Sequence, residues 1–130
     1  MNIKFTDVNN LKGIRISVDS YFINKKKIGK IIKYKFKNIL TVYNKGKNTI
    51  QIISNHKKIS DLHGINYISK VFKNKPILKP GNKLKLELNY TMKTRIASIF
   101  GYFSIISLNS SSRFKAHIPV IKLFPAEILN

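Results

Sequence analysis

A strict alternation of apolar and charged residues constrains the fold of this chain more than any other feature of its sequence. Side chains on a strand alternate between its two faces, so a period of two indicates a strand with one face buried and one in water. The clearest case is the segment 33–42, with an apolar face of Tyr34, Phe36, Leu40 and Val42 and a charged face of Lys33, Lys35 and Lys37. The same alternation appears in 14–19, 83–88 and 114–118, and no segment has the spacing of an amphipathic helix.

Turn-forming residues divide the rest of the chain into further short strands. The expected connections are a mobile lysine-rich loop at 24–30, turns at 44–46 and 61–64, a bend around Pro76 and Pro80, and a polar turn at 109–112. The apolar runs between them are 50–53, 65–72, 99–108 and 121–123. The run 99–108 is rich in β-branched and aromatic residues, which predicts a central strand. About seven strands without helices predict an all-β fold, either a sandwich or a barrel.

One domain accounts for the whole chain, 1–130, because this length leaves no room for two independent cores. The ends of the domain, 1–12 and 126–130, are expected to be loosely held. No apolar run approaches the ~20 residues that cross a bilayer. The segment 1–7 lacks the apolar stretch of a signal peptide, so we expect a cytoplasmic protein without a membrane span. The absence of cysteine excludes disulfides and thiolate metal sites.

The charge balance is strongly basic, with 25 Lys and Arg against 5 Asp and Glu and a formal net charge of +20. Such a field attracts polyanions, above all RNA and DNA. The arginines are Arg15, Arg95 and Arg113, so 25 − 3 leaves 22 lysines. Lys, Ile and Asn are the residues that AT-rich codons favour, whereas proteins that read nucleic acid tend to use arginine. The charge therefore predicts only weak, non-specific binding of nucleic acid, which salt disrupts.

Exposed rings among lysines would strengthen a nucleic-acid prediction, since bases stack on aromatic side chains. Tyr34 and Phe36 alternate with lysines and therefore face the core, which argues against RNA as the main partner. An exposed apolar groove would instead favour a protein partner.

Short motifs follow one another from residue 34 onward with near-constant spacing. They are Tyr34-x-Phe36 with the turn Asn44-x-Gly46, the segment 51–56 (Gln-Ile-Ile-Ser-Asn-His), the turn 61–64 (Asp-Leu-His-Gly), the bend 76–81 (Pro-Ile-Leu-Lys-Pro-Gly), Gly101-Tyr102-Phe103, and the ending 114–123 around Ile118-Pro119. In this order they resemble the ApaG family of small bacterial proteins. The resemblance is best supported over 31–125 and implies an antiparallel β-sandwich of the fibronectin type III or immunoglobulin-like kind. It also implies a non-catalytic binding domain, in a family linked to cobalt resistance and magnesium efflux.

The family's Gly-x-Gly-x-x-Gly loop, proposed as a pyrophosphate cradle, is altered in this chain. Its glycines correspond to Ile68, Lys70 and Lys73. A Cβ obstructs both the positive φ angles and the close backbone approach that such a cradle needs. The remaining phosphate-binding candidates are Lys70, Lys73 and Lys75, which would hold an anion weakly and by charge alone. A solvated lysine-rich loop is the simpler interpretation of the same residues.

Neither a metal site nor a catalytic site is predicted. His56, His63 and His117 are 7 and 54 residues apart, spacings that do not define a metal site. Ser54 and His56 share one face of a strand and Asp61 follows nearby, yet no glycine-flanked nucleophile turn surrounds the serine. We therefore predict no catalytic residues, no metal, no cofactor and no enzymatic activity.

Binding is thus the predicted role, and a protein is the predicted partner. The alternative is a weak electrostatic RNA- or phosphate-binding protein that uses its lysine-rich surface. The residues leave the oligomeric state open.

Overall fold

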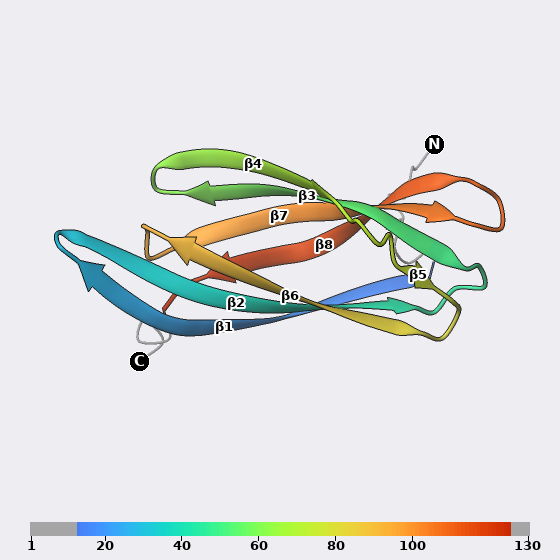
Figure 1. The fold of residues 1–130 in the computed structure, drawn as a ribbon, viewed down its shortest axis with the longest axis horizontal. Coiled ribbons are helices and arrows are strands. Elements are labelled where there is room, and N and C mark those ends of the chain that lie inside the picture. The colour runs from blue at the N-terminus through green and yellow to red at the C-terminus, as the bar shows by residue number, and fades with distance from the viewer. Residues whose placement is uncertain (1–12, 126–130) are drawn as a thin grey trace, which may run out of the picture.

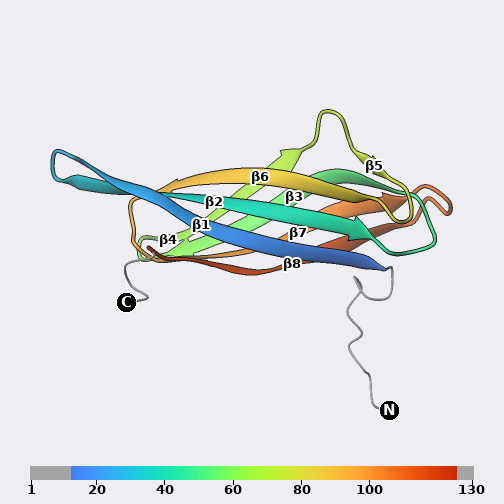
Figure 2. The same cartoon turned by 90° about the horizontal axis from the view of Figure 1, so that it is seen from below.

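Two antiparallel β-sheets lie face to face in the computed structural model, which describes residues 13–125 (Figures 1 and 2). The eight strands are β1 (Ile14–Ile28), β2 (Ile31–Asn44), β3 (Ile50–Asp61), β4 (Gly64–Val71), β5 (Ile77–Leu78), β6 (Lys83–Met92), β7 (Ala97–Ser107) and β8 (Arg113–Leu123). The three-stranded sheet has the order β1-β2-β6, and the five-stranded sheet has the order β4-β3-β7-β8 with β5 paired to β3. The predicted all-β antiparallel sandwich is confirmed, and the strand beyond the expected seven is the two-residue β5.

The core fills the space between the two sheets with the apolar alternate positions of their strands. Its most deeply buried side chains include Phe36, Leu40 and Val42 of β2, Ile52 of β3, and Phe103 and Ile105 of β7. Each such side chain contributes roughly 1.5–3 kcal/mol by leaving water. Tyr34 and Phe36 are only 6% and 2% exposed, which confirms that they face the core.

The lysine-rich segment 24–30, expected to be a mobile loop, is instead the end of a long hairpin that projects beyond the sandwich (Figure 1). β1 stays paired with β2 as far as Ile28 and Ile31. Gly29 and Lys30 alone form the turn, and Gly29 has a φ of +63°, as the first position of a type II′ turn requires. The loop prediction was wrong because backbone hydrogen bonds hold this ribbon together, although its side chains are exposed and show no alternation.

The turn predicted at 44–46 forms, and its asparagine ties β2 to the other sheet. The Oδ1 of Asn44 accepts a hydrogen bond from the backbone N–H of Gly46 at 3.0 Å. Its Nδ2 donates to the carbonyl oxygens of Asn48 at 2.8 Å and Leu78 at 2.9 Å. Because Leu78 belongs to β5, this buried amide connects the end of β2 in one sheet to β5 in the other. The turns predicted at 61–64 and around 109–112 are also present.

The ends expected to be loosely held, 1–12 and 126–130, lie outside the described residues. Between residues 13 and 125 every regular element is a strand. That part of the chain therefore contains no helix of the length and hydropathy needed to cross a membrane.

Candidate functional site

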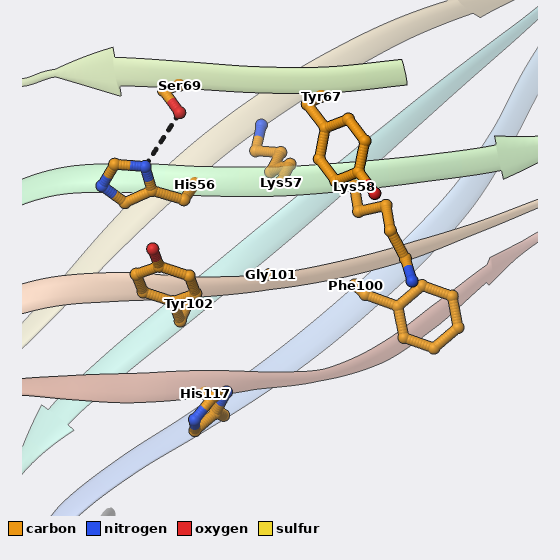
Figure 3. Close-up of a pocket in the computed structure, with 9 residues that line it drawn as sticks. All are labelled: His56, Lys57, Lys58, Tyr67, Ser69, Phe100, Gly101, Tyr102 and His117. Carbon is orange, nitrogen blue, oxygen red and sulfur yellow. Dashed lines mark hydrogen bonds between the residues drawn. The ribbon is translucent and has the colours of Figure 1, made fainter. Parts of the chain in front are cut away.

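The outer face of the five-stranded sheet carries a row of side chains, one from each of its four long strands (Figure 3). Backbone register places Ser69 of β4 opposite His56 of β3, and His56 opposite Tyr102 of β7. Tyr102 in turn lies opposite His117 of β8. The His56 and Tyr102 rings are stacked with centroids 4.8 Å apart, and His117 is tilted against Tyr102 at 5.9 Å. With strands ~4.8 Å apart, this row spans about 14 Å across the sheet.

A second row lies two residues further along β3, where Lys58 stands between two exposed rings. Its neighbours in register are Tyr67 on β4 and Phe100 on β7. Tyr67 is 76% exposed and Phe100 is 40% exposed. The Nζ of Lys58 lies 5.0 Å from the centroid of the Phe100 ring, which Figure 3 shows as a side chain reaching across to β7.

The two rows line an open groove with a volume of about 370 Å³. We call it the aromatic groove, and its side chains are His56, Lys58, Tyr67, Ser69, Phe100, Tyr102 and His117. A further lysine stands beside it, since the Nζ of Lys115 lies 4.8 Å from the centroid of the Tyr102 ring. Rings and ammonium groups therefore alternate across this surface.

Gly101 allows the close approach of β7 to β3 on which the groove depends. A Cβ at this position would lie 2.7 Å from the backbone carbonyl oxygen of His56, closer than non-bonded atoms approach. Because glycine has no Cβ, β3 and β7 stay in register and Tyr102 stacks on His56. On the other side of β7, the pairing with β8 shifts between Ile99 and Gly101, opposite Pro119. A proline, which has no N–H to donate, is tolerated there because β8 is an edge strand.

His56 is held by two serines. Its Nδ1 lies 2.8 Å from the Oγ of Ser69, and its Nε2 lies 2.8 Å from the Oγ of Ser54, which confirms that Ser54 and His56 share a face. Asp61 is five residues further along β3, about 16 Å away at a strand rise of ~3.3 Å. Its Oδ1 accepts a hydrogen bond from the backbone N–H of His63. The structure thus brings Ser54 and His56 together and keeps Asp61 apart from them.

The three histidines considered as metal ligands occupy different parts of the sheet. His56 and His117 lie on either side of Tyr102, whereas His63 lies in the turn between β3 and β4. Across the part of the chain that the structure describes, no group of three or more His, Asp or Glu side chains is placed to hold a metal ion.

One lysine of β3 also lines the groove, but its side chain ends between the sheets. Lys57 alternates with His56 and Lys58 and faces inward, where its Nζ lies 5.0 Å from the centroid of the Tyr90 ring on β6. Burial lowers the pKa of Lys57 below its ordinary value of 10.5, and the positive charge of Lys70 lowers that pKa further. Burial also raises the pKa of Tyr90 to about 12. The neutral ring and the ammonium group thus share a partly desolvated position at the open edge of the sandwich.

The phosphate-binding candidates lie along one edge of the five-stranded sheet. Ile68 and Lys70 belong to the regular strand β4, where they pair with Lys57 and Asn55. Lys73 and Lys75 lie in the connection from β4 to β5. Lys75 has a φ of +37°, and its carbonyl oxygen accepts a hydrogen bond from the side chain of Gln51 at 3.0 Å. The three lysines therefore occupy a strand and a short connection, and their role in binding phosphate stays a prediction.

The sequence did not predict the aromatic groove, because the strongly apolar run 99–108 indicates a central strand and not an exposed row of rings. β7 is central, and Ile99 and Phe103 are indeed buried. The residues between them include Phe100 and Tyr102, which stand two apart and point outward. A period of two was thus present within the apolar run, but only the strand order shows which rings of different strands meet.

Comparisons with known proteins support the family suggested by the sequence motifs. No family model matches the chain. Protein ApaG from two strains of Acidithiobacillus ferrooxidans is 26% identical to it over 120 residues, which cover 90% of this chain and 94% of the relative. An X-ray structure of a Northeast Structural Genomics Consortium target has a TM-score of 0.83 at 21% identity and covers 91% of both chains. A crystal structure of the ApaA protein from Bordetella pertussis has a TM-score of 0.79 at 20% identity, over 87% of this chain and 94% of that one.

The two solved structures share the fold of this chain, a small antiparallel β-sandwich. The two relatives that match the chain in sequence each bear the name protein ApaG. The chain is a homologue of protein ApaG, and the family resemblance found in its sequence is confirmed.

Proposed function

We propose that this protein is a non-catalytic binding module whose partner occupies the aromatic groove. The observation that carries the proposal is the alternation of exposed rings and ammonium groups on neighbouring strands of one sheet. Rings in water gain by being covered, and cations in water gain by meeting an anion. Because the side chains stand on paired strands, a partner meets a surface that needs little reordering.

The hydrogen bonds of His56 support binding in preference to catalysis. A histidine that activates a serine is normally oriented by a carboxylate on its second nitrogen. Here both ring nitrogens face serine hydroxyls, those of Ser54 and Ser69. Ser54 is only 6% exposed, so a substrate has little access to its oxygen. These contacts fix the imidazole against Tyr102 and thereby shape the groove.

A capture experiment tests this function. The protein is immobilised and exposed to a cell extract at two salt concentrations, with and without nuclease treatment. The bait is compared with the double variant Phe100→Ser/Tyr102→Ser and with the matched double variant Tyr21→Ser/Tyr43→Ser, which removes two rings from the outer face of the three-stranded sheet. We expect the first variant to lose a partner that the second retains. Equal retention by all three baits contradicts the proposal, as does an ester or phosphoester hydrolysis that Ser54→Ala abolishes.

The nuclease arm separates the two classes of partner. A partner that survives nuclease treatment and still depends on Phe100 and Tyr102 is the protein partner that the sequence predicts. A partner that disappears with nuclease is nucleic acid. The cytoplasmic location and the family's link to cobalt and magnesium stay predictions in either case.

Weak phosphate binding by Lys70, Lys73 and Lys75 is the second candidate function. One observation favours it: Lys70 pairs with Asn55, two residues from Lys57 on β3, and its charge lowers the pKa of Lys57. Two cations that repel each other at a sheet edge gain when an anion lies between them. The connection that carries Lys73 and Lys75 begins two residues beyond Lys70. A phosphate bound there would be held by ammonium groups alone.

A further inference from the structure

The chemistry of the aromatic groove indicates which class of partner it fits. We propose that the groove binds single-stranded nucleic acid, with bases stacked on its rings and phosphates held by its lysines. The proposal rests on the proposed function and deepens it by naming the occupant of the same groove. RNA and single-stranded DNA share this chemistry, and the experiment below includes both.

The rings are placed as a stacking platform requires. Phe100 and Tyr102 stand two apart on β7, about 7 Å along the strand at ~3.3 Å per residue. Tyr67 stands on β4 on the far side of Lys58. Sheet-based RNA-binding domains use rings on neighbouring strands in this way to stack two or three bases. Stacking needs no particular base, since every base has a flat face.

The lysines of the groove contact rings, and their ammonium groups can leave those rings to bind a phosphate. The Nζ of Lys58 lies over Phe100 and that of Lys115 lies over Tyr102, at 5.0 and 4.8 Å from the centroids. An exposed contact between an ammonium group and a ring is weak. The flexible lysine stem lets the ammonium group move aside, so that a base covers the ring while the charge meets the adjoining phosphate.

No carboxylate opposes these cations on this face between residues 13 and 125. The outward positions of β8 add the exposed residues Arg113 and Lys122 to Lys58 and Lys115. The acids in this part of the chain are Asp19 on β1, Asp61 at the end of β3 and Glu87 on β6. An acidic peptide would pair with the cations but leave the rings in water, and a duplex keeps its bases paired. A single strand of nucleic acid can cover the rings with its bases and pair its phosphates with the cations.

Tyr34 and Phe36, whose orientation argued against RNA, are not part of the aromatic groove. Those two side chains are buried between the sheets. The rings of the aromatic groove come from β3, β4, β7 and β8 and lie on the opposite side of the larger sheet.

The test measures fluorescence anisotropy of labelled strands at several salt concentrations. The probes are an oligouridylate of about twelve nucleotides, which exceeds the lower end of known single-strand sites, an abasic phosphodiester strand of the same length, an oligothymidylate and a duplex. We expect the oligouridylate and oligothymidylate to bind roughly tenfold or more tightly than the abasic strand, since each stacked base contributes separately. The abasic strand and the duplex measure the contribution of charge.

Variants assign the base-dependent part to the groove. We expect Tyr102→Ser to lower oligouridylate affinity about tenfold and leave abasic-strand affinity unchanged, because one stack is lost. Tyr102→Phe keeps the ring and should retain the affinity. Lys58→Gln/Lys115→Gln should weaken both strands and reduce the salt slope by about 1.4, at ~0.7 for each phosphate contact with a single strand. The matched control is Tyr43→Ser, whose ring also lies under a lysine, Lys83, on the other sheet.

Equal affinity for the oligouridylate and the abasic strand overturns the proposal, as does an equal loss in Tyr43→Ser and Tyr102→Ser. A melting curve for each variant shows whether it is folded, and Phe100→Ser, which removes the other β7 ring of the groove, keeps the test decisive if Tyr102→Ser is not folded. Nucleic acid that fails to bind, together with a groove-dependent partner that survives nuclease, overturns this inference alone. The absence of any groove-dependent partner overturns the proposed function as well.

Discussion

Both sheets of this sandwich carry lysines on their outer faces, but they arrange their rings differently. On the three-stranded sheet, Tyr21 and Tyr43 each have a lysine nearby, yet they lie six register positions apart, about 20 Å at ~3.3 Å per residue. On the five-stranded sheet, Tyr102 stacks on a ring of the next strand and Phe100 lies two residues away. Charge alone gives a surface that attracts any polyanion. Charge with adjoining rings gives a surface that distinguishes one partner from another.

The two outer faces also differ in their acidic residues. Glu87 lies 3.7 Å from Lys37, and Asp19 stands on β1, so the three-stranded face neutralises part of its own charge. The five-stranded face has no acid among its described outward residues. The two faces therefore differ in how rings and charges are arranged on them, since both belong to strands with the same period of two.

Gly101→Val should have the largest effect of the variants considered, and it should affect only the five-stranded sheet. Its Cβ would meet the carbonyl oxygen of His56 at 2.7 Å, and that atom belongs to backbone. We expect the free energy of unfolding to fall by about 1–3 kcal/mol, as for other overpacked positions. Urea denaturation measures the change. The control, Asn89→Val on the exposed face of β6, should stay within about 0.5 kcal/mol of the parent, and equal losses in the two variants would show that β3 and β7 have room to separate.

Tyr90→Phe tests the lysine–tyrosine contact that lies between the sheets instead of outside them. In the folded state the pKa of Tyr90 is raised from 10.0 to about 12, so the folded protein keeps a proton that the unfolded chain loses. The free energy of unfolding therefore falls as the pH rises between these values. Two pH units correspond to at most about 2 kcal/mol once partial exposure is allowed for. Urea midpoints between about pH 10 and pH 12 should fall less steeply in Tyr90→Phe.

Lys57→Met tests a contribution to the pH dependence of the free energy of unfolding that has the opposite sign to that of Tyr90. The pKa of Lys57 is lowered, so the folded protein loses this proton before the unfolded chain does. Its contribution makes the free energy of unfolding rise as the pH increases from the lowered pKa toward 10.5. The variant should lose that rise. Parallel alkaline curves for the parent and both variants would place these two side chains in ordinary solvent.

The layout of the sandwich followed from local patterns, whereas the site depended on contacts between distant segments. Tyr34 and Phe36 could be assigned to the core from their alternation alone, because burial follows the period of a strand. The loop expected at 24–30 was wrong, because a solvated ribbon shows no alternation. The row from His56 to Tyr102 joins positions 46 residues apart, since 102 − 56 = 46. No local pattern fixes such a register, so the groove appeared only with the strand order.

The triple variant Lys70→Gln/Lys73→Gln/Lys75→Gln tests whether the edge of the larger sheet binds phosphate. We expect pyrophosphate to bind weakly to the parent at low salt, to be released by moderate salt, and to bind a few-fold less tightly to the variant, since exposed charges are screened. Isothermal titration at two salt concentrations measures this. The matched control, Lys37→Gln/Lys83→Gln/Lys85→Gln, removes the same charge from the three-stranded sheet. Salt-resistant affinity that survives the first triple variant would place the anion site elsewhere.

Asp19→Asn/Glu87→Gln should have the smallest effect, and it tests directly whether acidic residues cause the difference between the two outer faces. It removes both acids from the outer face of the three-stranded sheet and adds two to the net charge, so that face becomes as uniformly basic as the other. The lost ion pair joins side chains that are 33% and 59% exposed, so stability should change by less than about 0.5 kcal/mol. Affinity for oligouridylate and for the abasic strand should rise together at low salt, because the added attraction acts on phosphate. Anisotropy titrations that show a new preference for the strand with bases would mean that isolated rings such as Tyr43 suffice for stacking, and the adjoining rings of the five-stranded sheet would then have no special role.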